Sequence, residues 1–406
     1  MVNVAIMGHG TVGSGVAELI IKNSNHINRE IKTELRLKHI LDLRKFEGLS
    51  YSDRFTDDFN VILNDKEVDI VVETMGGLHP AYDFVKACLL AGKSVVTSNK
   101  ELVAEKGVEL IKIAEEKNVN FLFEASVGGG IPVIRPICQC LAANEISEIK
   151  GILNGTTNFI LNKMVTENMD FSDALKIAQD KGYAEKDPTA DIEGHDACRK
   201  ICILAALAFG KHVYPEQVKC EGVTGVSLTD IEYANTLGYA IKLIGKAKKN
   251  SDGTVSVSVA PMLVSHEHLL SGVNGVFNAI SVIGDAVDEV IFYGRGAGKM
   301  PTASAVVADV MDAAKHLKAR KYISWEEGSD SYVAEKDEPT VLYVYIKTCD
   351  FKKTSADIEN LFPNSLLIKN EHSGEIAFLT GREPESSLNE KIDKIFADNK
   401  KILHTI

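Results

Sequence analysis

Residues 181–200 form a short segment that is dense in side chains able to do acid–base chemistry, and five of its charged residues stand out. They are Glu185, Asp187, Asp191, Asp196 and Lys200. Asp196 and Lys200 are four residues apart, so a helix would place them on one face, with the acid N-terminal to the base, which favours pairing. Residues 201–209 are apolar throughout, so the helix is predicted to be largely buried and to carry Lys200 into the core.

This acid–base spacing has two interpretations. A solvated pair of this kind contributes only about 0.3–0.5 kcal/mol. In a buried setting, desolvation favours the neutral amine of Lys200, whereas Asp196 favours its ammonium form, and that balance suits a lysine to proton transfer. The spacing alone leaves both a structural ion pair and a proton-transfer site open.

A glycine-rich loop near the start of the chain indicates dinucleotide binding. Residues 2–7 have the pattern of a buried strand, residues 8–13 contain three glycines spaced G-x-G-x-x-G, and residues 16–21 begin an apolar helix. These glycines permit a tight turn, close approach of a pyrophosphate and packing of helix on strand, while the helix N-terminus offers free N–H groups. A tight turn without a ligand is the alternative. The predicted cofactor-binding residues are Gly8, Gly10, Thr11, Val12 and Gly13.

Two more predicted strands end in residues suited to a ligand site. Residues 68–73 are followed by Thr74, and residues 94–97 are followed shortly by Lys100 at the start of a helical pattern. Ligands of doubly wound sheets bind at the carboxyl ends of the strands, so Lys100 is placed where a nicotinamide and its substrate would meet. A solvated lysine at a helix start is the alternative.

Together these motifs resemble those of homoserine dehydrogenases, from residue 2 to about residue 318. The matching segments are 8–16, 97–100, 124–132, 151–160, 182–200, 284–287 and 296–305. The resemblance implies NAD(P)-dependent interconversion of L-homoserine and L-aspartate 4-semialdehyde, a step in threonine and methionine biosynthesis. The cofactor would perform the hydride transfer, while the protein supplies position and charge.

The resemblance also assigns residues to roles. Lys200 matches the proton-transfer lysine, and Lys100 matches a second active-site lysine that also contacts the cofactor. Glu185 and Asp196 match acids that bind the substrate. The remaining assignments are Asp191 in a supporting role, Gly155 and Thr156 near the substrate, and Gly182 and Gly298 in the cofactor set. For Gly155 and Thr156, an ordinary turn is an equally good interpretation.

A cation loop is a further implication of the resemblance. Glu124 and the carbonyl groups of Val127, Gly129 and Ile131 correspond to residues that surround a sodium ion. Oxygen ligands suit a hard cation, and glycines free the backbone to provide them. A hinge at which the chain leaves the nucleotide-binding domain is a second interpretation, compatible with the first.

The end of the second strand pattern bears on cofactor preference. Asp42 suits the ribose hydroxyls of NAD and repels a 2′-phosphate, whereas Arg44 just beyond it could bind that phosphate. Relatives that prefer NADP often carry a basic residue where this chain has Leu41. The sequence therefore favours NAD slightly without excluding NADP.

Composition limits the class of partner. The 406 residues are 45% hydrophobic and 25% charged, as in soluble globular proteins, and a net charge of −12 argues against nucleic acid. No apolar run reaches the roughly 20 residues of a membrane helix, and the first residues suit a strand rather than a signal peptide. Seven cysteines without a C-x-x-C pair indicate reduced thiols. We expect a cytoplasmic protein with a small-molecule substrate, and the resemblance adds a homodimer or homotetramer.

The predicted fold is α/β with three domains. Residues 1–130, completed by about 296–320, form a Rossmann-type doubly wound sheet, and residues 131–295 form an α+β substrate and dimerisation domain with a mixed sheet. Helical patterns in that second domain cover residues 131–141, 158–167, 171–181 and 229–244. Residues 330–406 read as βαββαβ, the ferredoxin-like order, and resemble the ACT regulatory domain.

The tail departs from the ACT pattern, because residues 350–354 contain no glycine where an amino-acid effector would bind. We therefore expect weak or absent inhibition by threonine.

Two other functions are open to a chain with a glycine loop. Another Rossmann-type dehydrogenase acting on an amino-acid semialdehyde would need a nucleophilic cysteine. A non-catalytic nucleotide-sensing regulator would have no use for Lys100 together with Lys200.

Overall fold

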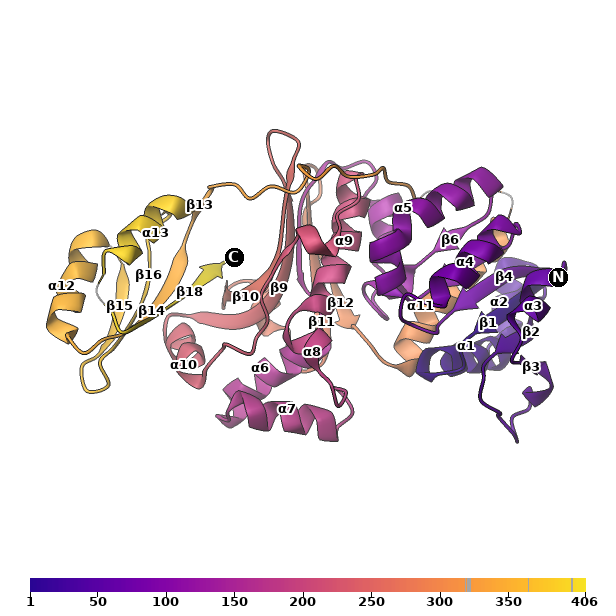
Figure 1. The fold of residues 1–406 in the computed structure, drawn as a ribbon, viewed down its shortest axis with the longest axis horizontal. Helices are drawn as coiled ribbons and strands as arrows, with labels where there is room; N and C mark the ends of the chain where they lie inside the picture. Colours follow the sequence, from indigo (N-terminus) through magenta and orange to yellow (C-terminus); the bar gives the residue numbers. More distant parts are fainter. Residues whose placement is uncertain (318, 320–322, 364, 396) are drawn as a thin grey trace.

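The computed structural model describes residues 1–406 except 318, 320–322, 364 and 396. A six-stranded parallel sheet at one end of the molecule has the order β3-β2-β1-β4-β5-β6 (Figure 1). The first, fourth and fifth strands are almost wholly buried, as expected of a parallel sheet covered on both faces. The strands are β1 (Val2–Met7), β2 (Leu35–Leu41), β3 (Phe55–Thr56), β4 (Val68–Glu73), β5 (Ser94–Thr97) and β6 (Phe121–Leu122).

The helices of this unit come from two distant parts of the chain. Those from the first part are α1 (Thr11–Lys22), α2 (Ser24–Ile31), α3 (Phe59–Asn64), α4 (Ala81–Leu90) and α5 (Lys100–Lys117). From far along the chain, α11 (Lys299–Lys315) returns to pack against α1, β4 and β5. This return confirms that a later segment completes the first unit; α11 ends at Lys315, and Lys318 lies outside the described residues.

A second, mixed sheet forms the middle of the molecule. Its strands are β7 (Ile146–Ile152), β8 (Lys219–Cys220), β9 (Tyr239–Lys249), β10 (Val255–Ser265), β11 (Phe277–Gly284) and β12 (Asp288–Arg295). The accompanying helices are α6 (Gly155–Glu167), α7 (Phe171–Asp180), α8 (Thr189–Ile192), α9 (His195–Phe209) and α10 (Leu228–Thr236). Because α9 packs against both this sheet and α5, it lies at the junction with the first unit (Figure 1).

The C-terminal strands continue the middle sheet. Those strands are β14 (Leu342–Lys347), β15 (Leu366–Asn370), β16 (Glu375–Leu379) and β18 (Asn399–Thr405), with helices α12 (Phe351–Leu361) and α13 (Glu385–Asp393). The order β18-β14-β16-β15, antiparallel throughout, is that of a ferredoxin-like unit. β18 also pairs in parallel with β10, so strands predicted to form two sheets belong to one. A short pair, β13 (Pro339–Thr340) and β17 (Glu383–Pro384), lies outside it.

The α/β class, the Rossmann-type sheet and the mixed central sheet are confirmed, but two helix predictions are wrong. Of the helix predicted over 229–244, only Leu228–Thr236 is helical, and the rest belongs to β9, which pairs with both β10 and β7. The hydrogen bonds with β7 join residues distant in the chain, so local periodicity does not reveal that pairing. Of the helix predicted over 131–141, mainly Pro136–Cys140 is helical, as a π-helix, since Pro132 and Pro136 restrict the backbone before it.

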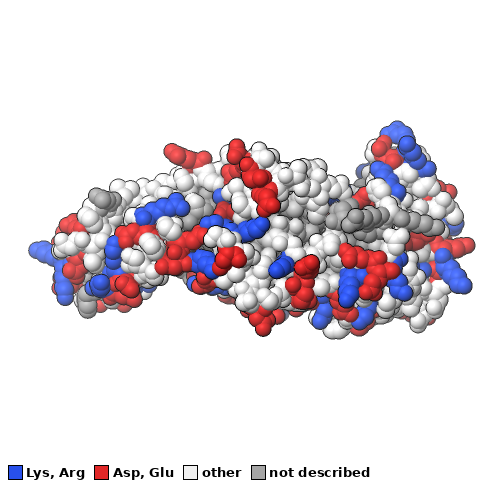
Figure 2. Space-filling view, turned by 90° about the horizontal axis from the view of Figure 1, so that it is seen from above, with Lys and Arg blue, Asp and Glu red and all other residues white. Residues whose placement is uncertain are grey.

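Charged side chains of both signs intermingle over the face shown in Figure 2. Among the described helices, none combines the length and hydropathy needed to cross a bilayer.

Candidate active site

The glycine loop between β1 and α1 leaves no room for a side chain at its last glycine. A Cβ atom on Gly13 would lie 1.9 Å from the carbonyl oxygen of Gly8 and 2.7 Å from Oγ1 of Thr74. Thr74 Oγ1 donates a hydrogen bond of 2.8 Å to that same carbonyl, which ties the loop to the end of β4. No side chain caps the N-terminus of α1, where Thr11 and Val12 begin the helix, so its N–H groups can receive a phosphate.

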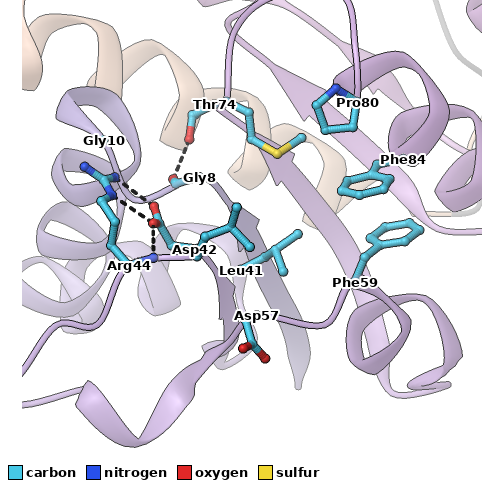
Figure 3. A pocket seen from close by; sticks show the side chains of 12 residues that line it. Gly8, Gly10, Leu41, Asp42, Arg44, Asp57, Phe59, Thr74, Pro80 and Phe84 are labelled. Carbon is cyan, nitrogen blue, oxygen red and sulfur yellow. Dashed lines mark hydrogen bonds and ion pairs between the residues drawn. The ribbon is translucent and has the colours of Figure 1, made fainter.

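A cavity of about 550 Å³ opens beside this loop (Figure 3). Gly8, Gly10 and Thr74 line one side, and the stacked rings of Phe59 and Phe84, 3.9 Å between centroids, line another. The remaining lining residues are Leu41, Asp42, Leu43, Arg44, Asp57, Met75 and Pro80. This cavity lies at the carboxyl ends of β1, β2 and β4, where a dinucleotide binds in doubly wound sheets.

Asp42 and Arg44 lie together on one side of the cavity, joined by the dashed lines of Figure 3. Arg44 Nη2 is 2.8 Å from Asp42 Oδ2, and Arg44 Nε is 2.9 Å from Asp42 Oδ1. The amide of His9 also donates to Asp42, at 2.8 Å. The Arg44 hydrogen bonds hold the pKa of the Asp42 carboxyl well below its usual range. Asp42 therefore stays charged, while the Arg44 side chain remains 63% exposed.

Asp196, near the start of α9, binds both predicted lysines. Lys200 Nζ lies 2.7 Å from Asp196 Oδ2, and Lys100, at the start of α5, forms an ion pair with Oδ1. Lys200 also donates to the carbonyl of Leu153, at 2.7 Å. The Asp196 and Lys200 side chains are 4% and 9% exposed, whereas that of Lys100 is 40% exposed. The structure thus brings together three residues from two units of the fold.

The pKa values of the two lysines are shifted in opposite directions. Burial lowers the pKa of Lys200 against the opposing effect of Asp196, and the nearby charge of Lys100 lowers it further. The Asp196 carboxylate raises the pKa of Lys100. Burial alone would raise the pKa of Asp196, but the two lysines outweigh it and hold that pKa below its usual range. Lys200 is therefore the more easily deprotonated of the two, which makes its neutral amine available to accept a proton, and Lys100 is the more firmly charged.

Asn154 extends the cluster to a second acid. It caps α6 by accepting a hydrogen bond from the amide of Thr157, and its Nδ2 atom lies 2.8 Å from Asp196 Oδ2 and 2.7 Å from Asp191 Oδ1. Burial raises the pKa of Asp191, as does the charge of Asp196. Sequence reasoning did not single out Asn154, although an asparagine one residue before a helical pattern is an N-cap signal.

Thr156, on the same helix, donates to the carbonyl of Tyr183 at 2.7 Å, which holds the 181–188 turn against α6. Gly155 packs closely against Val276, whose carbonyl oxygen would lie 2.8 Å from a Cβ there. Glu185 is exposed, and among the described residues its carboxylate has no part in the hydrogen-bonded cluster around Asp196.

The two glycines assigned to the cofactor lie in different surroundings. Gly298 directly precedes α11, beside α1. Gly182 lies in the exposed turn after α7, and it does not line the cavity beside the glycine loop.

In the predicted cation loop, the carboxylate of Glu124 binds backbone amide groups. The Glu124 carboxylate accepts hydrogen bonds from the amides of Val133, Ile134 and Arg135, at 2.6, 2.7 and 2.8 Å. It therefore binds the start of the following helical segment. Among the described residues, the carbonyl oxygens of Val127, Gly129 and Ile131 accept no hydrogen bond. Any cation here would thus depend mainly on these three carbonyl groups.

Family models match both the nucleotide-binding unit and the central unit, which together form the site. Residues 8–124 match the family model described as homoserine dehydrogenase, NAD binding domain, and residues 132–311 match the homoserine dehydrogenase model. The homoserine dehydrogenase of Neisseria gonorrhoeae is 42% identical over 84% of this chain and 83% of its own. The chain belongs to the homoserine dehydrogenase family.

Relatives of known structure support this membership. A homoserine dehydrogenase from Thiobacillus denitrificans superposes with a TM-score of 0.89 at 35% identity, covering 100% of this chain and 98% of its own. A hyperthermophilic archaeal homoserine dehydrogenase in complex with NADPH has a TM-score of 0.68 at 30% identity, covering 79% and 99% of the two chains. Membership of the homoserine dehydrogenase family excludes the nucleotide-sensing regulator and the cysteine-dependent semialdehyde dehydrogenase. Burial also raises the pKa of the Cys138 thiol to about 12, unlike that of a nucleophile.

Proposed function

We propose that the protein catalyses the reversible NAD(P)-dependent oxidation of L-homoserine to L-aspartate 4-semialdehyde, as a cytoplasmic enzyme of threonine and methionine biosynthesis. The observation that carries this proposal is the binding of Lys100 and Lys200 to opposite oxygens of Asp196, at the junction of the nucleotide-binding and central units. Oxidation of an alcohol removes a hydride and a proton, so a site beside the nicotinamide needs a base within reach of the hydroxyl.

Lys200 is our candidate for that base. Its buried amine has a lowered pKa, and Asp196 and the Leu153 carbonyl orient it through bonds of 2.7 Å. Lys100 keeps its charge and stabilises the developing alkoxide or the substrate carboxylate. The bound nicotinamide accepts the hydride.

The acids around the lysines bind the substrate ammonium group in our proposal. Asp191 is half-buried beside Asn154, and Glu185 is exposed on the turn tied to Thr156. Folding of that turn over the substrate would bring Glu185 to the ammonium group. Gly155 and Thr156 then form the floor of the substrate site.

For the cofactor we propose a preference for NAD. The charged Asp42 carboxylate suits the ribose hydroxyls and repels a 2′-phosphate. Arg44 opposes this preference, because its exposed guanidinium could turn from Asp42 to a phosphate, so NADP is the weaker alternative. Gly10, Thr11 and Val12 receive the pyrophosphate at the α1 N-terminus.

We also propose a sodium ion held by the carbonyl groups of Val127, Gly129 and Ile131. Support comes from the lack of N–H donors to these oxygens within the described residues. Oxygen-only ligands suit a hard monovalent cation. Glu124, through its three amide bonds, would keep the loop in shape.

The remaining proposals concern domains and assembly. The division into residues 1–130 with about 296–320, 131–295 and 330–406 follows the three groups of elements, although Arg320 lies outside the described residues. The central unit would form the contact of a homodimer or homotetramer. We propose an ACT-like C-terminal unit on which threonine acts weakly, because residues 350–354 lack a glycine.

The experiment that tests the proposed reaction is an initial-rate assay of homoserine oxidation. Formation of reduced cofactor is followed with NAD+ and, separately, with NADP+, and O-methylhomoserine serves as the control that lacks a free hydroxyl. We expect homoserine-dependent reduction of both cofactors with a higher kcat/KM for NAD+. Absence of reduction with either cofactor contradicts the proposal.

A further inference from the structure

The segment that leaves the nucleotide-binding unit for the C-terminal unit crosses the junction between α5 and α9. Residues 323–328, here called the strap, follow α11 and run beside Gly210–His212, just beyond the end of α9. The amide of Glu326 donates to the carbonyl of Gly210 at 2.9 Å, and the amide of His212 donates to the carbonyl of Glu326 at 2.8 Å. The strap is thereby fixed to the central unit.

Trp325 of the strap packs against the nucleotide-binding unit. Its ring lies over Gly107 of α5, where an added Cβ would be 2.7 Å from the indole carbon Cζ2. Phe123 meets the same ring edge-on at 5.7 Å between centroids. Trp325 is only 6% exposed and Phe123 is fully buried, so this contact excludes water.

His212 joins the two units a second time. Its Nε2 atom donates to the carbonyl of Ala104 on α5 at 2.8 Å, and its ring stacks on Trp325 at 5.9 Å between centroids. Burial lowers the pKa of His212, so the ring is neutral and Nε2 carries a proton. Trp325 and His212 thus form one buried contact that spans α5, the end of α9 and the strap.

The same two helices carry the residues of the active site. Lys100 begins α5, and Asp196 lies in the first turn of α9. Besides their ion pair, the helices meet there through Arg199 and Glu101, 3.3 Å apart, with side chains 26% and 34% exposed. Exposed ion pairs contribute little to fixed geometry and weaken with salt. The buried Trp325–His212 contact is the more rigid connection.

We propose that Trp325 is a positioning residue, which holds α5 against α9 so that Lys100 stays in register with Asp196. Trp325 acts through the helix and does not itself contact the reacting atoms. The inference rests on the proposed roles of Lys100 and Asp196. The strap would thus help to position active-site residues, although it contributes no catalytic side chain.

The test uses two variants of the full chain, Gly107→Ala and Trp325→Ala. The methyl group of the first pushes the indole ring off α5, and the second removes the ring. Trp325 is the only tryptophan, so intrinsic fluorescence reports its surroundings directly. For Gly107→Ala we expect red-shifted emission and unchanged helix content by circular dichroism. For both variants we expect kcat about tenfold lower and a KM for NAD+ within about twofold, as for misplacement of a reacting group.

Salt dependence separates positioning from general stability. Without the Trp325 contact the helices depend more on the partly exposed Arg199–Glu101 pair, so the kcat of Trp325→Ala should fall further in tetramethylammonium chloride while the wild-type kcat changes little. The matched control is Gly381→Ala, a glycine at which a Cβ would meet no atom within 4 Å. We expect wild-type kcat and salt response for it.

The proposal is overturned by wild-type kcat in Trp325→Ala, or by displaced Trp325 in Gly107→Ala without loss of kcat. Lys100→Ala, assayed in parallel, distinguishes failure of the proposed role of Lys100 from failure of the proposed role of Trp325. Near-normal turnover of Lys100→Ala contradicts the proposed role of that lysine. Impaired Lys100→Ala beside normal Trp325→Ala contradicts only the role of the strap.

Discussion

Lys200 and Asp196 lie one turn apart on α9 and form a buried ion pair of 2.7 Å, in which Asp196 is shared with Lys100. Replacement of Asp196 by asparagine leaves two ammonium groups without their counter-charge. We expect the free energy of unfolding to fall by about 3–5 kcal/mol, the cost of breaking a buried pair from one side.

Urea denaturation measures this change. Glu101→Gln, which breaks the partly exposed pair with Arg199, is the matched control and should cost less than about 1 kcal/mol. Equal losses of unfolding free energy in the two variants would mean that burial does not make the Asp196 pair more stabilising than the Arg199–Glu101 pair.

The lowered pKa of Lys200 sets the pH dependence of the reaction. Below its ordinary value of 10.5, a larger fraction of the buried amine is neutral than in a solvated lysine. We expect kcat/KM for homoserine oxidation to rise with pH through an apparent pKa below 10.5, and this limb to vanish in Lys200→Arg, whose guanidinium keeps its proton. A pH–rate profile of the two proteins makes the comparison, and an identical limb in the variant assigns the titration to another group.

The lowered pKa of Lys200 also makes the stability of the fold depend on pH. Between the lowered folded pKa of Lys200 and its ordinary unfolded value, the unfolded chain binds more protons than the native one. The contribution of Lys200 to stability therefore increases as pH rises through that window.

Much of the catalytic centre could be predicted from short-range spacing. The interval between Asp196 and Lys200 is one helical turn, so their pairing follows from the helix alone. The glycine loop is a local strand–turn–helix unit, and its residues lie where that unit requires. Lys100 follows a buried strand directly, so its place at the carboxyl edge of the sheet followed from topology.

Contacts between distant segments could not be predicted in this way. Asn154 binds Asp191 and Asp196 from another element, and the interval of about 40 residues has no periodicity to reveal it. Glu124 likewise meets amides beyond the loop assigned to it, because a buried carboxyl group needs hydrogen-bond partners. The strand at 239–249 was misread for a related reason, since its pairing with β7 joins residues distant in the chain.

Gly13 offers a sharp test of the nucleotide site. Even the methyl group of Gly13→Ala would overlap the carbonyl of Gly8, at 1.9 Å, and separate α1 from β1. We expect loss of NAD+ binding by about 100-fold or more, since the pyrophosphate contacts depend on that loop. Isothermal titration calorimetry measures it, with Gly381→Ala as the control glycine, and retained affinity would place the dinucleotide elsewhere.

Asp42 is expected to set the cofactor ratio. Asp42→Ser removes the charge that repels a 2′-phosphate and releases the guanidinium of Arg44. We expect the ratio of kcat/KM for NADP+ to that for NAD+ to rise by about tenfold or more. Asp57→Ser, which alters another carboxylate of the same cavity, should change the ratio by less than about twofold. An unchanged ratio in Asp42→Ser assigns discrimination to other residues.

The most direct test of the central claim is the turnover number of Lys200→Ala in homoserine oxidation, measured beside its affinity for NAD+. The matched control is Lys112→Ala, which removes an exposed lysine from α5. If Lys200 is the proton acceptor, kcat falls by about 100-fold or more, the scale of lost general base catalysis, while NAD+ affinity stays within about twofold. Near-wild-type turnover of Lys200→Ala contradicts the account.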